Sequence, residues 1–294
     1  MPDTAREYRD RLFCFIFGSE EHKDWTLSLY NAVNGTAYDN PDEIVITTLM
    51  QVVYMGMHND VAFLITDEIN MYEQQSTFNP NMPLRLMQYT SNVYEKLITL
   101  WQKNKYGKTL IRLPVPKLVV FYNGAKDEPD ERILHLSDAF AEGKREDADI
   151  TVRVRMININ AGRSPGIIHA CKPLDEYTWL IDRIRAYEKT VTLDVAVDTA
   201  LDEMPEDYLI RPYLEANRVE VKKMLLTEYN EAKTMELFKE EGRAEGRAEG
   251  RTEGEIRLSA LITKLISLGR AEEIARVASD RAYRDRLYEE FSMV

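Results

Sequence analysis

The segment from His58 to Ser76 carries the residues of this chain that are best placed to do chemistry. Two apolar runs flank the polar pair Thr66 and Asp67, and this pattern predicts a β-hairpin with a two-residue loop. In that register Asp60 lies opposite Glu73, with Cβ atoms about 5 Å apart. Two carboxylates so close repel each other unless a cation lies between them, and hard divalent cations bind carboxylate oxygens. The spacing therefore predicts a metal site at Asp60 and Glu73.

Gln75 extends this candidate site, because residues two apart on a strand point to the same face of the sheet. The resulting set is Asp60, Glu73 and Gln75 on one face of the hairpin. The register decides whether the set exists, since a slip of one residue would place Asp60 and Glu73 on opposite faces. Exposed acids are also common on hairpins, so an ordinary solvent-facing strand is the alternative interpretation.

The same residues carry a resemblance to a known family. The pattern D-x(12)-E-x-Q on a predicted hairpin resembles the signature of the PD-(D/E)XK nucleases, with Gln75 where many members have Lys. A wider set of segments resembles the Rpn/YhgA-like family of recombination-promoting nucleases and transposase-like proteins. These segments are YRDRLFCFIFG (8–18), LSLYNAVNG (27–35), NDVAFL (59–64), YEQQSTFNPNMPLR (72–85), FYNG (121–124) and MININ (156–160). The resemblance covers roughly residues 5–235.

The resemblance implies an α/β fold, namely a restriction-endonuclease-like PD-(D/E)XK core with a central mixed sheet flanked by helices. It also implies an endonuclease linked to recombination or mobile elements. This enzyme would hydrolyse DNA phosphodiesters with Mg²⁺ or Mn²⁺ bound by Asp60 and Glu73. An acid on the first helix joins the metal site in the family, and Asp10 is the matching position. Alternatively, Asp10 is a solvent-facing acid that the helix dipole favours. Gln75 can hydrogen-bond a water but lacks the charge of Lys, so we expect slower chemistry or help from Arg85.

A basic segment follows the hairpin directly. Residues 85–117 hold seven Lys or Arg side chains against one acid, Glu95, which gives a net charge of +6. A DNA phosphate beside Asp60 and Glu73 would fit against this segment. We therefore predict nucleic-acid contacts at Arg85, Lys96, Lys103 and Lys105. A solvated helix end and loop is the alternative for the segment, and Arg85 could instead anchor Glu73 in a structural ion pair.

Composition limits the class of protein. A chain of 294 residues with 44% hydrophobic residues can hold one large domain with a sizeable core, plus appendages. It has no run of about 18 apolar residues and no apolar signal-peptide core, so we expect a cytoplasmic protein without a membrane partner.

Cys14 and Cys171 are far apart and lack CxxC partners, which favours buried free thiols. The net charge of −12 argues against a surface coated for nonspecific DNA binding.

Helices and strands are expected to alternate around the hairpin. Helical periodicity and stop signals predict helices at 4–17, 22–33 and 83–103. Short apolar runs predict buried strands at 116–124 and 149–159. The acidic stretch 125–149 between these strands is expected to hold only a short helical piece, at 136–141. Helical patterns fill the rest of the domain, at 174–188, 191–203 and 206–240.

A tetrad repeat sets the expected domain boundary. Glu-Gly-Arg-Ala recurs from Glu241, and its last partial copy ends at Glu255. As a helix the repeat would place like charges four residues apart and would include four glycines, and both features lower the stability of an isolated helix. A flexible linker is therefore one interpretation. The other is a helix that pairs with further copies through its acidic and basic stripes. We therefore expect a nuclease-like domain at 1–240, a charged linker or helix at 241–255 and a small helical segment at 256–294.

Two functions remain open on the sequence alone. The first is a Mg²⁺-dependent endodeoxyribonuclease with DNA as its partner. The second is a catalytically silent scaffold on a nuclease fold, which would form a homo-oligomer through the C-terminal region. The overall acidity and the missing Lys favour the scaffold, and metal binding by Asp60 and Glu73 distinguishes the two.

Overall fold

The computed structural model describes residues 12–46, 60–226, 254 and 256–291, without the side chain of Asp60. By its internal contacts the chain divides into two compact units, Met1–Ala232 and Lys233–Val294. Asp10 and all of the tetrad repeat except Gly254 lie outside the described residues. The catalytic role of Asp10 and the domain boundary near residue 240 therefore stay predictions.

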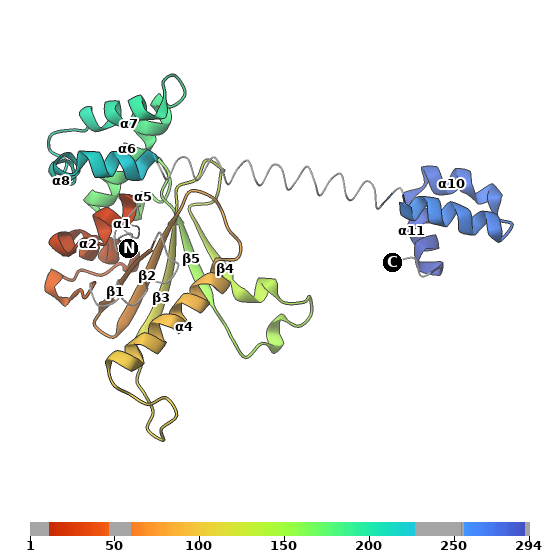
Figure 1. The fold of residues 1–294 in the computed structure, drawn as a ribbon, viewed down its shortest axis with the longest axis horizontal. Coiled ribbons are helices and arrows are strands. Elements are labelled where there is room, and N and C mark those ends of the chain that lie inside the picture. The colour runs from red at the N-terminus through yellow and green to blue at the C-terminus, as the bar shows by residue number, and fades with distance from the viewer. Residues whose placement is uncertain (1–11, 47–59, 227–253, 255, 292–294) are drawn as a thin grey trace, which may run out of the picture. The chain divides into compact units, whose positions relative to one another are not determined.

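A five-stranded mixed sheet forms the centre of the first unit, in the order β1-β2-β3-β5-β4 (Figure 1). Its strands are β1 (Asp60–Ile65), β2 (Glu68–Gln75), β3 (Val115–Tyr122), β4 (Glu131–His135) and β5 (Arg153–Asn158). β2, β3 and β5 run parallel, while β1 and β4 are antiparallel edge strands. The predicted α/β class with a central mixed sheet and flanking helices is confirmed.

The β1–β2 hairpin has the register that the sequence predicted. Asp60 pairs with Glu73, and the pairing continues to Ile65 opposite Glu68. Thr66 makes the turn with a φ of 50°. The two-residue loop fixes this register, because the length of a hairpin loop determines which residues of the two strands pair.

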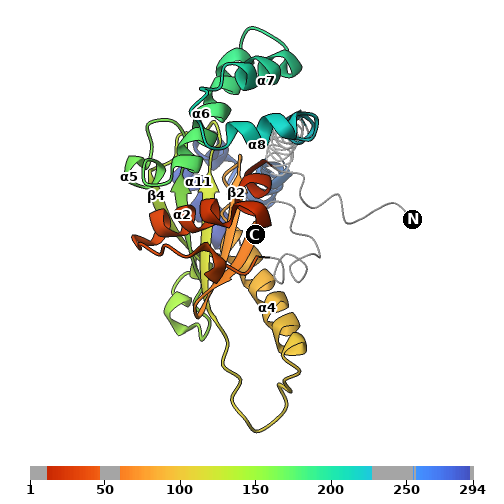
Figure 2. The same cartoon turned by 90° about the vertical axis from the view of Figure 1, so that its left-hand side faces the viewer.

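Helices cover both faces of the sheet (Figures 1 and 2). One face packs against α4 (Met82–Leu100), which buries Leu86, Val93 and Leu97 against strand residues. The other face packs against three helices, α1 (Leu12–Phe17), α2 (Lys23–Asn34) and α6 (Lys172–Tyr187). Pro83 in the first turn of α4 and the left-handed Gly35 after α2 are the start and stop signals expected from the sequence.

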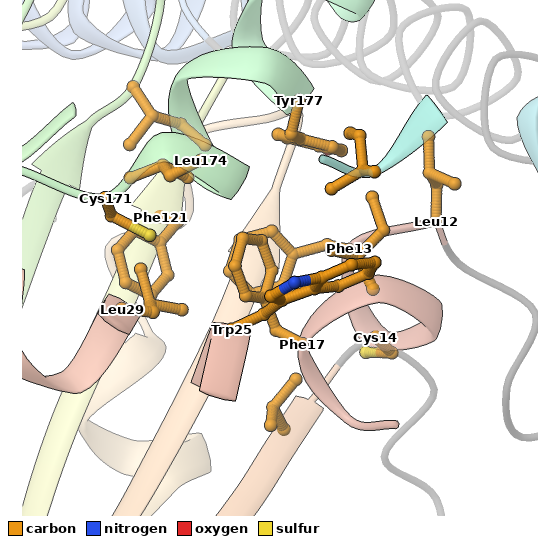
Figure 3. Close-up of a cluster of buried hydrophobic side chains, with 14 of the residues drawn as sticks. Leu12, Phe13, Cys14, Phe17, Trp25, Leu29, Phe121, Cys171, Leu174 and Tyr177 are labelled. Carbon is orange, nitrogen blue, oxygen red and sulfur yellow. The ribbon is translucent and has the colours of Figure 1, made fainter. Parts of the chain in front are cut away.

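The larger core lies under α1, α2 and α6 and is rich in aromatic rings (Figure 3). The ring of Phe13 lies 5.1 Å from that of Phe121 and 5.7 Å, edge to face, from that of Tyr177. Cys171 lies in the same core, and burial raises the pKa of its thiol to about 11. Both cysteines are buried and free, as predicted.

The prediction for the acidic stretch before β5 was wrong in one respect. We expected no strand there, but β4 pairs with β5 along the edge of the sheet. Four of its five residues are exposed and only Leu134 is buried, so the segment lacks the apolar alternation that marks a strand. Pairing with β5, rather than burial, holds it in place. The short helical piece is a single 3₁₀ turn, η4 (Leu136–Ala139).

The described residues of the first unit after β5 are mainly helical, as expected. The remaining helices with defined bounds are α5 (Pro165–Ile168), α7 (Leu193–Asp202) and α8 (Arg211–Ala216). Glu176 of α6 is buried, and its two carboxylate oxygens accept hydrogen bonds from the backbone N–H groups of Leu209 and Ile210, each at 2.9 Å. This carboxylate ties α6 to the residues that lead into α8.

The C-terminal unit has its own small core. The helical run 256–267, α10 (Ile274–Ser279) and α11 (Arg281–Glu290) enclose five buried side chains, Leu261, Leu265, Val277, Leu287 and Tyr288. The C-terminal helices of the sequence prediction are thus present. Among the helices that the structure describes, none combines the length and the apolar character that a bilayer span requires.

Candidate active site at the end of the hairpin

The candidate site lies at the carboxyl end of β2, beside the first turns of α4. Alternation along β2 gives Met71, Glu73 and Gln75 one face of the sheet and Tyr72 and Gln74 the other. Met71 belongs to the core under α4, so Glu73 and Gln75 point toward that helix. Glu73 is fully buried and Gln75 is nearly so.

One side chain from β2 and one from α4 donate hydrogen bonds to the Glu73 carboxylate. Gln75 Nε2 donates to Glu73 Oε1 at 3.0 Å, and an Nη of Arg85 donates to the same oxygen at 2.9 Å. Gln75 Nε2 also lies 2.8 Å from the sulfur of Met82. The guanidinium of Arg85 approaches the hydroxyl oxygen of Tyr89 at 3.3 Å. Of the two roles considered for Arg85, the structure therefore shows the one in which it anchors Glu73.

The metal-binding prediction rests on Asp60 and Glu73. The register places Asp60 directly opposite Glu73, and the side chain of Asp60 lies outside the described part of the structure. Among the described residues, no three His, Cys, Asp or Glu side chains form a cluster that could hold a metal. Mg²⁺ usually binds one or two carboxylates and completes its shell with water and substrate phosphate. The chemistry of this donor set fits Mg²⁺ or Mn²⁺ better than a structural zinc site.

The predicted nucleic-acid contacts do not all lie near Glu73. Arg85 does, but α4 then runs away from the site, and Leu100 is roughly 22 Å further along its axis. Lys103 and Lys105 follow the end of α4, and the chain returns at Val115, which pairs with Glu68 at the far end of β2. Lys96 lies on the second half of α4 and is half-buried. The structure thus brings Arg85, Glu73 and Gln75 together and keeps Lys103 and Lys105 apart from them.

A second polar network lies at the same edge of the sheet, on the opposite face. Gln74 Nε2 donates to Asn123 Oδ1 at 2.7 Å, and Asn123 Nδ2 donates to the hydroxyl of Tyr177 at 3.2 Å. Arg185 of α6 donates to Asn160 Oδ1 at 2.7 Å and to the backbone oxygen of Asn123. These bonds tie the carboxyl ends of β2, β3 and β5 to α6 beside a small open pocket.

The sequence interpretation did not assign a role to this network. Asn123 belongs to the FYNG segment and Asn160 to MININ, and both motifs follow buried strands. Polar residues at the carboxyl ends of parallel strands meet at one edge of the sheet. The position of these asparagines after buried strands is therefore the sequence feature that could have predicted the network. Gly124 is required here, because a Cβ at this position would come within 2.2 Å of the backbone oxygen of Ser76.

The arrangement holds the buried Glu73 carboxylate in a fixed orientation, and the register of the hairpin sets Asp60 opposite it. Glu73 receives hydrogen bonds from an amide and a guanidinium, and β2 is braced from its other face through Gln74. A fixed carboxylate at Glu73, with Asp60 opposite it in the register, suits a divalent cation and a phosphate ester. Comparisons of the chain with protein-family models, with curated proteins and with solved structures each gave no match.

Proposed function

We propose that this chain is a metal-dependent DNA endonuclease with a PD-(D/E)XK-type core, similar to the Rpn/YhgA-like nucleases. One observation carries the proposal: the register of the hairpin sets Asp60 opposite Glu73, and Gln75 donates to the Glu73 carboxylate. These are the three positions of the D-x(12)-E-x-Q pattern. Asp60 and Glu73 would hold Mg²⁺ or Mn²⁺, and Asp10 would supply a further carboxylate.

The chain's own residues have separate tasks in this proposal. The chemistry supplied by Mg²⁺ or Mn²⁺, when bound, is polarisation of the scissile phosphate and a lower pKa for a bound water. Arg85 balances the charge of Glu73 and fixes its orientation through the 2.9 Å hydrogen bond. Its side chain is 35% exposed, so it can also reach a phosphate oxygen of the substrate. The Gln75 amide orients Glu73 and the attacking water without adding charge.

The setting of the site agrees with this assignment. A mixed sheet that carries the acid pair on an edge hairpin is the arrangement expected of the PD-(D/E)XK core. We place the protein in the cytoplasm, where its two buried thiols would stay reduced. DNA is its proposed partner, and the C-terminal region is the proposed contact for a homo-oligomer.

Cleavage of supercoiled plasmid tests the proposal directly. We expect the intact protein to nick the plasmid with Mg²⁺ or Mn²⁺ and not with EDTA. Asp60→Asn and Glu73→Gln should each lower the nicking rate by about a hundredfold or more, because each removes a charged ligand. Asp67→Asn is the matched control, since it makes the same chemical change in the exposed turn of the same hairpin and should cleave like the intact protein. Nicking that survives Asp60→Asn would contradict the proposal.

A silent scaffold is the second candidate, and the Arg85–Glu73 pair favours it. A guanidinium already balances this buried carboxylate, so the fold does not need a metal to stabilise it. In that case neither the intact protein nor Asp60→Asn would cleave plasmid, and calorimetry would detect no Mn²⁺ binding. Sedimentation would instead show an oligomer that dissociates when residues 241–255 are deleted.

A further inference from the structure

The chain between α4 and β3 forms a projecting loop that the proposed active site does not use. We call residues 101–114 the basic arm; Figures 1 and 2 show it extending beyond the end of α4. It holds four cations, Lys103, Lys105, Lys108 and Arg112, and no acid. This concentration of positive charge stands out in a chain whose net charge is −12.

The basic arm is held at both ends and has local structure at its tip. The hydroxyl of Tyr94 on α4 donates to the backbone oxygen of Pro114 at 2.7 Å, and Val115 N donates to the backbone oxygen of Asp67 at 2.8 Å. Near the tip, Asn104 accepts hydrogen bonds from the backbone N–H groups of Tyr106 and Gly107. The arm is therefore a folded projection with fixed ends.

Large apolar side chains of the arm face solvent. Tyr106 is 87% exposed and Leu110 is 88% exposed, whereas side chains of this size are usually buried at least in part. Trp101 at the base of the arm is 40% exposed. Several exposed apolar groups within one short segment mark a surface that contacts a partner.

The cations of the arm are available to an anionic partner. Lys103, Lys108 and Arg112 are exposed, and none of them forms an ion pair within the described part of the chain. Lys105 pairs with Glu95 at 2.6 Å, and its ammonium lies 5.5 Å from the centroid of the Tyr106 ring. A planar group stacked on that ring would therefore lie close to several positive charges.

We propose that the basic arm binds single-stranded nucleic acid, with an unpaired base stacked on Tyr106 and backbone phosphates on Lys103, Lys108 and Arg112. Charge complementarity requires a polyanion, and exposed aromatic rings among cations are the usual means of holding unpaired bases. Duplex bases already stack on one another and offer no free face to the ring. A lipid bilayer fits less well, because cations alternate with the apolar residues along the arm and would have to enter the hydrocarbon with them.

This binding site is separate from the proposed centre of hydrolysis. Glu68, which pairs with Val115 at the end of the arm, lies roughly 23 Å along β2 from Gln75. Binding by the arm should therefore need neither metal nor Asp60. A failure of the arm proposal and a failure of the nuclease proposal give different results, since the first is a loss of binding and the second a loss of cleavage.

Fluorescence anisotropy with labelled 20-nucleotide oligothymidine, in EDTA, tests the proposal on the full chain. We expect Tyr106→Ala to weaken binding about tenfold and Tyr106→Phe, which keeps the ring, to bind like the intact protein. The triple variant Lys103→Gln, Lys108→Gln, Arg112→Gln should weaken binding at least tenfold. It should also reduce the slope of log K against log salt by about 2, because three phosphate contacts are lost.

The matched control removes three exposed cations elsewhere on the first unit, with Arg153→Gln, Arg183→Gln and Lys189→Gln, and should bind normally. Circular dichroism of each variant confirms that it is folded. The proposal is overturned by no binding of the oligothymidine, by an unchanged affinity in Tyr106→Ala, or by equal affinity for a blunt 20-base-pair duplex. It is also overturned if the triple variant loses binding to phosphatidylserine vesicles but keeps its affinity for the oligothymidine.

Discussion

Glu73 is a buried carboxylate whose charge is balanced by a neighbouring side chain of the same unit. Its carboxylate oxygen Oε1 accepts from both Arg85 and Gln75, although burial of an ionised acid costs several kcal/mol without such partners. Ionisable residues that are buried despite such a cost in stability are concentrated at functional sites, which makes Glu73 a candidate functional residue. The same contact also has a structural consequence that can be measured independently of activity.

Arg85→Ala should lower the free energy of unfolding by about 2 kcal/mol, because it leaves Glu73 buried without its guanidinium. Urea unfolding followed by circular dichroism measures this change. In a Glu73→Gln background the same substitution should cost less than about 1 kcal/mol, since there is no longer a charge to balance. Lys105→Ala is the control, because it breaks an exposed ion pair with Glu95 and should change stability much less than Arg85→Ala does. Equal losses in both Glu73 backgrounds would contradict the role assigned to Arg85.

At the scale of elements, the β1–β2 hairpin decides whether a site exists at all. Its register sets Asp60 opposite Glu73, and its turn is made by Thr66 and Asp67. Thr66 adopts a left-handed φ of 50°, a conformation that costs a β-branched residue about 1 kcal/mol or more. The turn therefore stores strain at the end of the hairpin opposite Asp60 and Glu73.

Thr66→Gly should raise the free energy of unfolding by about 0.5–1 kcal/mol, because glycine adopts a positive φ without a clash. Thermal unfolding of the intact chain and the variant provides the comparison. The substitution also removes the hydrogen bond from Thr66 Oγ1 to the backbone oxygen of Ile65, at 2.7 Å. A loss of stability would show that this bond outweighs the strain of the turn.

At the scale of the whole molecule, the chain consists of two units with separate cores. The first unit has two layers of buried side chains, one on each face of its sheet, whereas the core of the C-terminal unit consists of five buried residues. So small a core supplies only a few kcal/mol. The C-terminal unit should therefore be the less stable of the two.

Leu265→Ala tests this difference, because it removes a fully buried side chain from the C-terminal core at a cost of about 2–5 kcal/mol. All three tryptophans, Trp25, Trp101 and Trp179, lie in the first unit, so their fluorescence reports on that unit alone. We expect the variant to lose helical circular dichroism at low urea while its tryptophan transition is unchanged. Leu180→Ala, in the core of the first unit, should instead shift the tryptophan transition. A shift of that transition in Leu265→Ala would mean that the two units unfold together.

The sequence by itself predicted the hairpin and its register, because a two-residue loop at Thr66 and Asp67 leaves one pairing of the flanking strands. It also determined the start of α4, the end of α2 and the burial of both cysteines.

Tertiary structure decided the rest. Arg85 meets Glu73 only because α4 packs across β2, and Lys103 and Lys105 lie far away because α4 is long and straight. β4 forms only by pairing with β5, and the Gln74–Asn123–Arg185 network joins residues more than 100 positions apart in the sequence. Long-range contacts of these kinds leave no local periodicity, so the local pattern of the sequence does not predict which side chains meet.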